Sequence, residues 1–316
     1  MTKPVPTLGR LPLLGSLPKD GHKVSVGLRM SRVVARRLYI APLAAVLGAL
    51  TIIPTIYILV VSFTDSAAIN RDTAFVGIAN YTAMFTSADY WAVLVRTLFF
   101  VVVAVTLQLA IGLGAAVAMV KMHRGSAVVR GLLLLPMAAA PIATYFNWQQ
   151  ILNASFGPIA YLLHSAGLPA PNWLGQPGLA LLTLIVVDTW QWTPFVFIIL
   201  AGGLATIPGE LDEAAAVDGA NSWQRFLHIT LPLLMPYVAV AVLFRSIDAL
   251  KTFDSVQILT SGGPGSSTTM LNYWIFKQGI SFLEFGKASA SAVVFLIVCI
   301  LLANALLRVL YRADRA

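Results

Sequence analysis

Residues 213–232 read EAAAVDGANSWQRFLHITLP, a polar stretch that lies between two long apolar runs. Pro208 and the acidic residues after it favour the start of a short helix, because acidic side chains stabilise a helix N-terminus. Gly219 interrupts that helix, since glycine adopts positive φ freely. A second amphipathic turn follows, and Pro232 opens the next apolar run where a missing N–H costs little. The stretch predicts two short helices lying across one face of a membrane.

Composition points to a membrane protein. Hydrophobic residues make up 58% of the 316 residues, charged residues make up 11%, and the mean hydropathy is +0.82. A soluble domain of this length does not need so much apolar surface. The net charge of +8 comes from basic residues that flank apolar segments, which favours a topology signal over nucleic-acid binding. The one cysteine, Cys299, lies in an apolar run and is expected to serve packing.

Six apolar runs reach the roughly 20 residues that a helix needs to cross a bilayer. They are residues 38–63, 97–120, 128–148, 178–204, 231–253 and 288–311. The sequence therefore predicts an all-α polytopic membrane protein with six transmembrane helices in one domain, residues 38–311. Residues 1–37 are expected to form a basic cytoplasmic tail without a signal peptide, and residues 312–316 a short cytoplasmic tail.

The distribution of basic residues predicts the orientation. Most of the 21 Lys and Arg residues lie before the first run, after the second run and at the C-terminus. By the positive-inside rule, both termini are cytoplasmic. The loop 205–232 is net acidic, so this rule alone does not place it. Alternation across six spans puts that loop on the cytoplasmic side as well.

The opening stretch resembles the EAA loop in the membrane subunits of bacterial ATP-binding-cassette (ABC) importers. The pattern of that loop is EAA, three residues, G, nine residues, I, any residue, LP, and the chain matches every fixed position at its spacing. The residues expected to couple to an ATPase are Glu213, Ala214, Ala215, Asp218, Gly219, Ile229, Leu231 and Pro232. The alternative is an ordinary acidic cytoplasmic loop.

Three weaker resemblances agree with the first in their order along the chain. The segments AFVGIANYTAMF (74–85), FDSVQILTSGGP (253–264) and FLEFGKASA (282–290) are similar to segments of the carbohydrate-uptake branch, the maltose- and glycerol-3-phosphate-type permeases. The resemblance implies a type I ABC importer permease fold in a bacterial plasma (inner) membrane. It also implies a second permease subunit of similar fold, two cytoplasmic ATPase subunits and an extracytoplasmic solute-binding protein as partners.

The sequence contains no motif that predicts catalysis. It has no G-x-x-x-x-G-K-[ST] phosphate loop, no His/Cys/Asp/Glu cluster with metal-ligand spacing and no recognisable nucleophile set. We therefore expect a transport subunit that is not an enzyme and binds no cofactor. ATP and Mg would be held by the partner ATPase subunits.

Polar side chains within the apolar runs are candidates for the substrate pathway, because an ionised group costs about 2.5–3.5 kcal/mol at a helix centre on insertion scales. Carboxylate, amide and indole groups suit carbohydrate. The candidates are Asp188, Gln191, Trp192, Asn147, Arg245 and Asp248. Interhelical hydrogen bonding between subunits is the alternative for the first three, and an interfacial belt is the alternative for Asn147. Asp188 and Arg245 lie at similar depths, which predicts a contact between them; Asp248 is the competing partner of Arg245.

These observations favour a permease subunit that forms half of the pathway for a sugar, polyol or related solute and couples transport to ATP hydrolysis on separate subunits. An ABC permease for glycerol 3-phosphate, an amino acid or a peptide would keep the same loop and take a different ligand. A secondary transporter would explain six spans and charges within the membrane, but it would leave the EAA loop unexplained.

Overall fold

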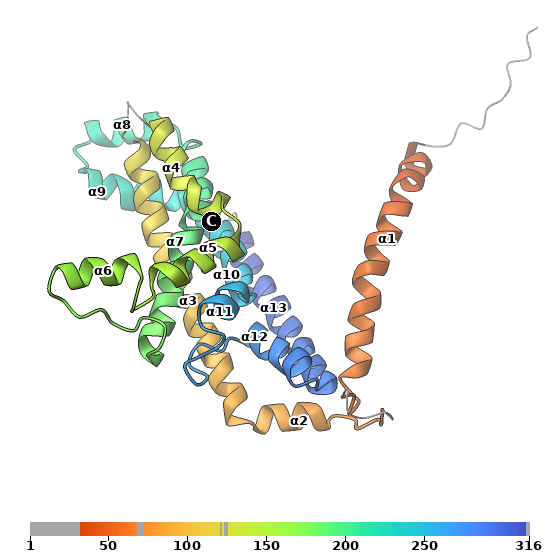
Figure 1. Cartoon of the computed structure of the whole chain (residues 1–316). Coiled ribbons are helices and arrows are strands. Elements are labelled where there is room, and N and C mark those ends of the chain that lie inside the picture. The colour runs from red at the N-terminus through yellow and green to blue at the C-terminus, as the bar shows by residue number, and fades with distance from the viewer. Residues whose placement is uncertain (1–31, 68–72, 121, 123–125, 314–316) are drawn as a thin grey trace, which may run out of the picture. The chain divides into compact units, whose positions relative to one another are not determined.

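The computed structural model describes residues 32–67, 73–120, 122 and 126–313, which are predominantly helical (Figure 1). The α-helices are α1 Arg32–Val61, α2 Ala79–Thr86, α3 Ala88–Val120, α4 Ser126–Ala138, α5 Pro141–Ile151, α6 Pro158–Ser165, α7 Pro177–Leu204, α8 Gly209–Val217, α9 Ser222–Arg225, α10 Leu231–Leu250, α11 Asp254–Leu259, α12 Leu271–Phe276 and α13 Phe285–Ala313. Two π-helical turns, η1 Phe226–Thr230 and η2 Lys277–Ser281, continue α9 and α12.

Within the described residues, five helices are long and apolar enough to cross a membrane. They are Tyr39–Val61, Ala88–Val120, Pro177–Leu204, Ser222–Leu250 and Phe285–Ala305. A sixth span arises if α4 and α5, which meet at 93°, are counted together. The predicted all-α membrane fold is therefore confirmed.

The run of residues 128–148, predicted as one span, is broken in the structure. The helix stops at Ala138 and restarts at Pro141. Proline has no N–H with which to continue the backbone hydrogen bonds of the helix, and it disfavours the helical conformation of the residue before it. Ala140, the residue before it, accordingly has an extended ψ of 126°.

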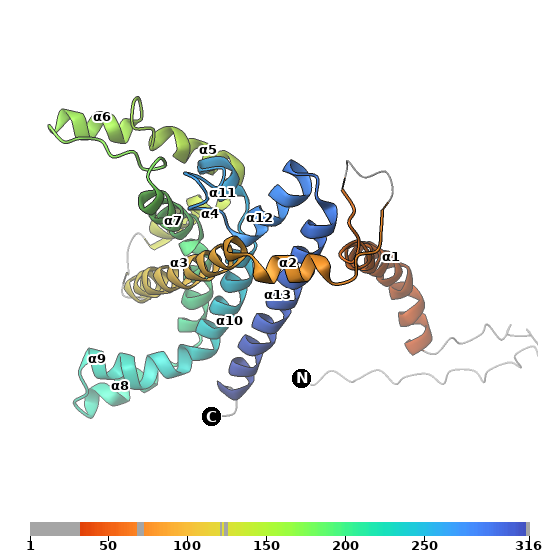
Figure 2. The same cartoon turned by 90° about the horizontal axis from the view of Figure 1, so that it is seen from below.

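Helices α3, α7 and α10 form the centre of the bundle, and α3 and α7 share the most extensive contact (Figures 1 and 2). Gly112 on α3 makes this closeness possible. A Cβ at this position would lie 2.9 Å from Val196 Cγ1 and 3.2 Å from the backbone nitrogen of Phe197. Small residues commonly allow membrane helices to approach closely, so this glycine sets the distance between α3 and α7.

The chain that follows α1 is tied to α2 and to the start of α13. The Asn80 side chain donates to the carbonyl oxygens of Ser62 (2.9 Å) and Thr64 (2.8 Å). The Gly286 N–H donates to the carbonyl oxygen of Ser66 at 2.9 Å. Two segments that resemble sugar permeases, 74–85 and 282–290, are thereby joined at the end of the bundle away from α8 and α9 (Figure 1).

The predicted tails lie partly outside the described residues, which leave out 1–31 and 314–316. Helix α1 already begins at Arg32 and α13 continues to Ala313, so the two outer helices extend a few residues past 38–311. The domain boundaries of the sequence analysis remain a prediction.

Candidate functional site

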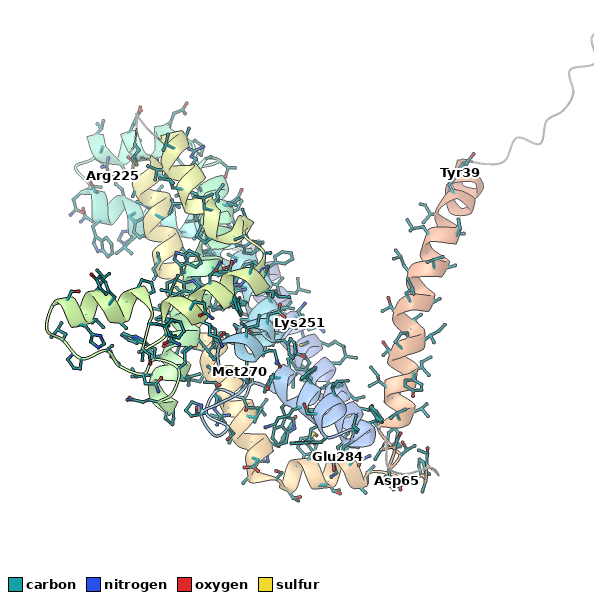
Figure 3. The ribbon with its side chains drawn as sticks, viewed as in Figure 1. Tyr39, Asp65, Arg225, Lys251, Met270 and Glu284 are labelled. Atoms are coloured by element: carbon teal, nitrogen blue, oxygen red, sulfur yellow. The ribbon has the colours of Figure 1, made fainter. Side chains whose placement is uncertain are left out.

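The EAA stretch folds into two short helices at one end of the bundle, where Figure 3 labels Arg225. Helix α8 ends in a Schellman motif, in which the Ala220 N–H donates to Ala215 O at 2.9 Å and the Gly219 N–H donates to Ala216 O at 3.1 Å. Gly219 adopts a φ of +84°. The predicted turn is therefore confirmed. Pro208 is the N-cap of α8.

The second short helix begins with a capping box and runs into a membrane span. Asn221 accepts from the Gln224 N–H, and the Gln224 side chain accepts from the Asn221 N–H, both at 2.9 Å. From Ser222 the helix continues through η1 and α10 to Leu250. An ion pair of 3.2 Å between Arg225 and Asp212 ties α9 to α8. A displacement of this helix pair would therefore be passed directly to α10.

No described side chain of α8 or α9 is buried, so the described part of the chain leaves this helix pair largely uncovered. Val217 is 88% exposed, and Trp223 is 66% exposed while stacked on Phe226. Glu213 is also exposed. Exposed large apolar side chains of this kind are typical of a protein-binding surface. We call the segment from Gly209 to Leu231 the coupling region, after the role that the resemblance of the EAA stretch predicts for it.

A buried polar network joins the three central helices. The Arg245 guanidinium on α10 donates to Gln108 Oε1 on α3 (2.7 Å) and to Asp188 Oδ2 on α7 (2.9 Å). Gln108 Nε2 donates to the same Asp188 oxygen at 2.8 Å. The predicted contact between Asp188 and Arg245 is confirmed. The side chains of Arg245 and Asp188 are 1% and 3% exposed, so water does not screen their attraction.

Arg245 also contacts Asp248, the competing partner predicted for it. Asp248, which is 49% exposed, pairs with another nitrogen of the same guanidinium. The Trp192 ring lies 5.0 Å from Arg245 Cζ and adds a cation–π contact. Gln108 was not among the residues predicted from the sequence. The available signal was an amide in the middle of the apolar run 97–120.

Two other candidates lie outside this network. Gln191 is buried, and its Nε2 donates to the Pro136 carbonyl oxygen at 2.6 Å. Because carbonyls in the last turn of a helix lack helical donors, this bond holds the end of α4 at its bend with α5. Asn147 is exposed on α5. Asp188 and Gln191 thus have protein partners, and a role in substrate contact stays a prediction for all six candidates.

The family model described as "Binding-protein-dependent transport system inner membrane component" matches residues 108–313. The chain belongs to this family. The matched range starts at Gln108 and contains the rest of the polar network and the coupling region. The resemblance of the EAA stretch to ABC importer permeases is thereby confirmed, and so is a place among inner-membrane transport components.

Relatives are similar along most of their length. The chain is 34% identical to the trehalose/maltose transport system permease protein MalF of Thermococcus litoralis, covering 81% of this chain and 86% of that protein. It is 33% identical to the sulfoquinovosyl glycerol transport system permease protein SmoG of Agrobacterium fabrum, covering 94% and 96%. It is 32% identical to the trehalose transport system permease protein SugA of Mycobacterium tuberculosis, covering 84% and 90%.

A solved structure supports the same fold. A chain of a bacterial alginate ABC transporter, crystallised in complex with an alginate pentasaccharide-bound periplasmic protein, aligns with a TM-score of 0.76 at 20% identity. The alignment covers 88% of this chain and 96% of that chain. At this identity the likeness shows the fold, which is that of an ABC importer permease.

Proposed function

We propose that this family member is one of two permease subunits in an ATP-driven importer for a sugar or a related hydroxyl-rich solute. The exposed coupling region carries the proposal. It combines the EAA pattern with an uncovered surface and a helix that runs without interruption into α10. A partner that moves this region would move a central span.

The partners follow from this role. The sequence has no phosphate-binding loop, so two separate cytoplasmic ATPase subunits supply the energy. These subunits bind the coupling region. A second permease completes the pathway, and an extracytoplasmic protein delivers the solute. The coupling region and both termini then face the cytoplasm.

The solute class rests on the relatives, three of which are named for trehalose, maltose or sulfoquinovosyl glycerol. The side chains at the edge of the buried network fit such a solute. Asp248 is half exposed and has an acceptor for hydroxyl groups, and the Trp192 indole can pack against the C–H face of a sugar.

Reconstitution tests the proposal. The native complex would be purified through a tag on this chain, its subunits identified by mass spectrometry, and the complex placed in liposomes with its binding protein outside. We expect ATP inside the liposomes to drive uptake of a labelled disaccharide such as trehalose or maltose. Labelled amino acids and glycerol 3-phosphate serve as matched comparison solutes.

Two outcomes contradict the proposal in different ways. Uptake of an amino acid or glycerol 3-phosphate without uptake of any sugar would keep the importer and replace its solute class. Uptake by this chain alone, driven by an ion gradient without ATP, would identify a secondary transporter.

A further inference from the structure

A hollow of about 460 Å³ lies between the end of α5, the segment that leads into α7 and the end of α11. Helix α11 packs beside α5 (Figure 2). Neither the polar network nor the coupling region contributes a described residue to its wall. The hollow lies before α7 and the coupling region after it, so the two are on opposite sides of the membrane if α7 crosses it. Its volume falls within the roughly 300–1,000 Å³ that is typical of small-molecule sites.

Three amide side chains in the wall are each held by the chain through one half of the amide. Asn153 Oδ1 accepts from two backbone N–H groups of the loop after α5, at 2.9 and 3.2 Å. Asn172 Oδ1 accepts from the Gly175 N–H at 2.9 Å, and Gln149 Nε2 donates to the Ile258 carbonyl oxygen at 2.7 Å. Because one half of each amide is bonded, the orientation of the other half is fixed as well.

The free halves of these amides can bond to a ligand. Asn153 Nδ2, Asn172 Nδ2 and Gln149 Oε1 have no partner among the described residues. Asn172 is an exposed residue, and the free atoms of Asn153 and Gln149 are not closed to solvent. Phe156, which is 71% exposed, adds an aromatic ring. The described wall holds no charged side chain, so it offers two donors, an acceptor and a ring to a neutral ligand.

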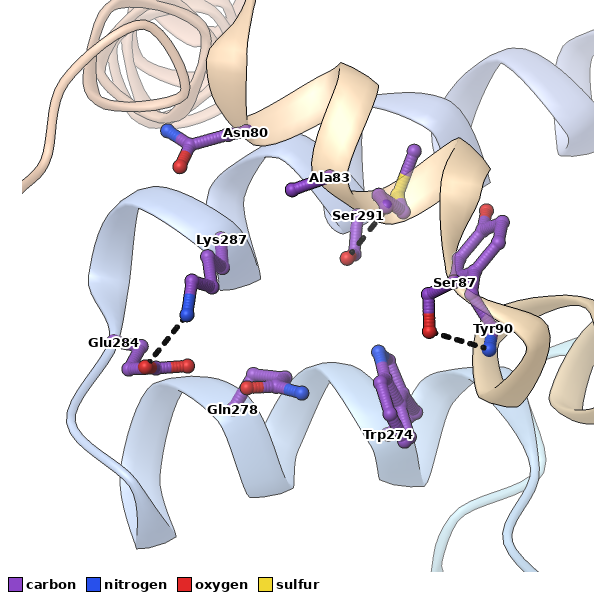
Figure 4. Close-up of a pocket in the computed structure, with 10 residues that line it drawn as sticks. Asn80, Ala83, Ser87, Tyr90, Trp274, Gln278, Glu284, Lys287 and Ser291 are labelled. Atoms are coloured by element: carbon purple, nitrogen blue, oxygen red, sulfur yellow. Dashed lines mark hydrogen bonds and ion pairs between the residues drawn. The ribbon is translucent and has the colours of Figure 1, made fainter. Parts of the chain in front are cut away.

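Another cavity, of about 230 Å³ beside α2, lacks such free groups (Figure 4). Its two charged residues, Glu284 and Lys287, form an ion pair of 2.8 Å with each other. The Ser87 hydroxyl accepts from the Tyr90 N–H at 3.4 Å. Most of its polar side chains are thus bonded within the protein, which makes the hollow beside α5 the better ligand site.

We propose that the hollow beside α5 binds a neutral mono- or disaccharide on the outer face of the transporter. Sugar hydroxyls accept from the free N–H groups of Asn153 and Asn172, and another hydroxyl donates to Gln149 Oε1. The C–H face of the sugar packs on Phe156. The proposal rests on the proposed function in one respect, since it takes the bound sugar to be the transported solute.

Protection of a single cysteine tests the site. Gln150 is exposed and lines the hollow, and its amide has no partner among the described residues, so Gln150→Cys in a Cys299→Ala background changes the wall least. The purified complex, without binding protein or ATP, is treated in nanodiscs with a charged thiol reagent. We expect trehalose or maltose, up to about 50 mM, to slow labelling at position 150; this concentration fills most sites whose dissociation constant is about 5 mM or less. Amino acids and glycerol 3-phosphate should not slow it.

Tyr161 supplies the matched controls, because it is as exposed as Phe156, at 71%, and does not line the hollow. A cysteine at position 161 should label at the same rate with and without sugar. In the Gln150→Cys background, Phe156→Ala should raise the sugar concentration for half protection about 3- to 10-fold, and Tyr161→Ala should leave it unchanged.

Three outcomes overturn the site: no protection of position 150 by either disaccharide, equal protection by glycerol 3-phosphate, or protection only by the sugar-free binding protein, which would identify a protein-docking face. The assay uses neither ATP nor uptake. Sugar uptake without protection would therefore overturn the site alone, and protection without sugar uptake would overturn the proposed function alone.

Discussion

Arg245 is the residue on which the buried network depends. Its guanidinium contacts side chains from α3 and α7 as well as Asp248 on its own helix. Transferring an unpaired charge from water to a protein interior costs several kcal/mol, and hydrogen-bonded partners must offset that cost. The network therefore links three helices through hydrogen bonds and ion pairs in addition to their apolar packing.

The first prediction concerns the pair of Asp188 and Arg245. Asp188→Asn and Arg245→Gln should each lower the free energy of unfolding by about 3 kcal/mol. Arg245→Gln leaves the buried Asp188 without a cation, and Asp188→Asn leaves Arg245 with only the half-exposed Asp248 as a charged partner. The double variant should lose about 1–3 kcal/mol less than the two losses added. Unfolding by SDS in mixed detergent micelles measures all four proteins of the cycle.

Asp248→Asn is the control for this cycle, since its side chain is 49% exposed and solvent screens the ion pair. It should cost no more than about 1 kcal/mol. Strictly additive losses for Asp188 and Arg245 would show that the contact contributes nothing to stability.

At the scale of elements, the coupling region depends on one turn and one ion pair. The Schellman motif ends α8 at Gly219, the capping box restarts the chain at Asn221, and Arg225 reaches back to Asp212. A Cβ added at Gly219 would meet nothing within 4 Å in this chain. The requirement for glycine therefore comes from the positive φ and not from crowding.

The second prediction follows from that backbone angle. Gly219→Val should insert into the membrane normally yet lose most ATP-driven uptake and ATPase stimulation, because a β-branched residue is strained at a φ of +84°. A strain of about 1–2 kcal/mol lowers the fraction of molecules with the native turn, and thus the native orientation of the second short helix, about 5- to 30-fold. Proteoliposome uptake and ATP hydrolysis measure the effect.

Gly219→Asn is the matched variant, because asparagine adopts the left-handed conformation more readily than other residues with a side chain. It should retain clearly more uptake than Gly219→Val. Equal uptake by the valine variant and the wild type would show that the turn geometry does not matter for coupling.

At the scale of the whole molecule, the bent pair of α4 and α5 decides the topology. Ser155 follows α5, and Gly209 follows α7. Because α7 is long enough to cross the membrane, these two residues lie on opposite sides if it does. A cytoplasmic coupling region therefore requires Ser155 to be outside. If the segment before α4 is cytoplasmic, as its basic residues predict, the pair α4–α5 must then cross the membrane once.

The third prediction tests on which side of the membrane these residues lie, by means of single cysteines in a Cys299→Ala background. A thiol reagent that cannot cross the membrane should label cysteines at positions 155 and 266 from outside. It should label a cysteine at position 209 only after the membrane has been permeabilised. Ser266 is exposed, whereas the hydroxyl of its neighbour Ser267 is buried, so Ser266 is the better probe. Labelling of Gly209 from outside would make α4–α5 a re-entrant hairpin and would contradict the coupling assignment.

Hydropathy and motif spacing by themselves determined the class of protein, the positions of the membrane helices and the coupling region. These features are local: a 20-residue apolar run or a glycine at a fixed distance from EAA can be recognised without knowing its neighbours. The depth of Asp188 and Arg245 along their helices also followed from counting residues, and their contact at 2.9 Å agrees with it.

Only the tertiary structure decided how the helices are rotated and which side chains meet. Hydropathy does not encode which face of a span turns inward, so Gln108 was not recognised and Gln191 was not expected to hold the Pro136 carbonyl. The size of the bend at Pro141, 93°, could not be predicted either, because proline inside an apolar run is compatible with a kink or a break. The hollow beside Asn153 and Asn172 exists only where α5, the segment before α7 and the end of α11 come together.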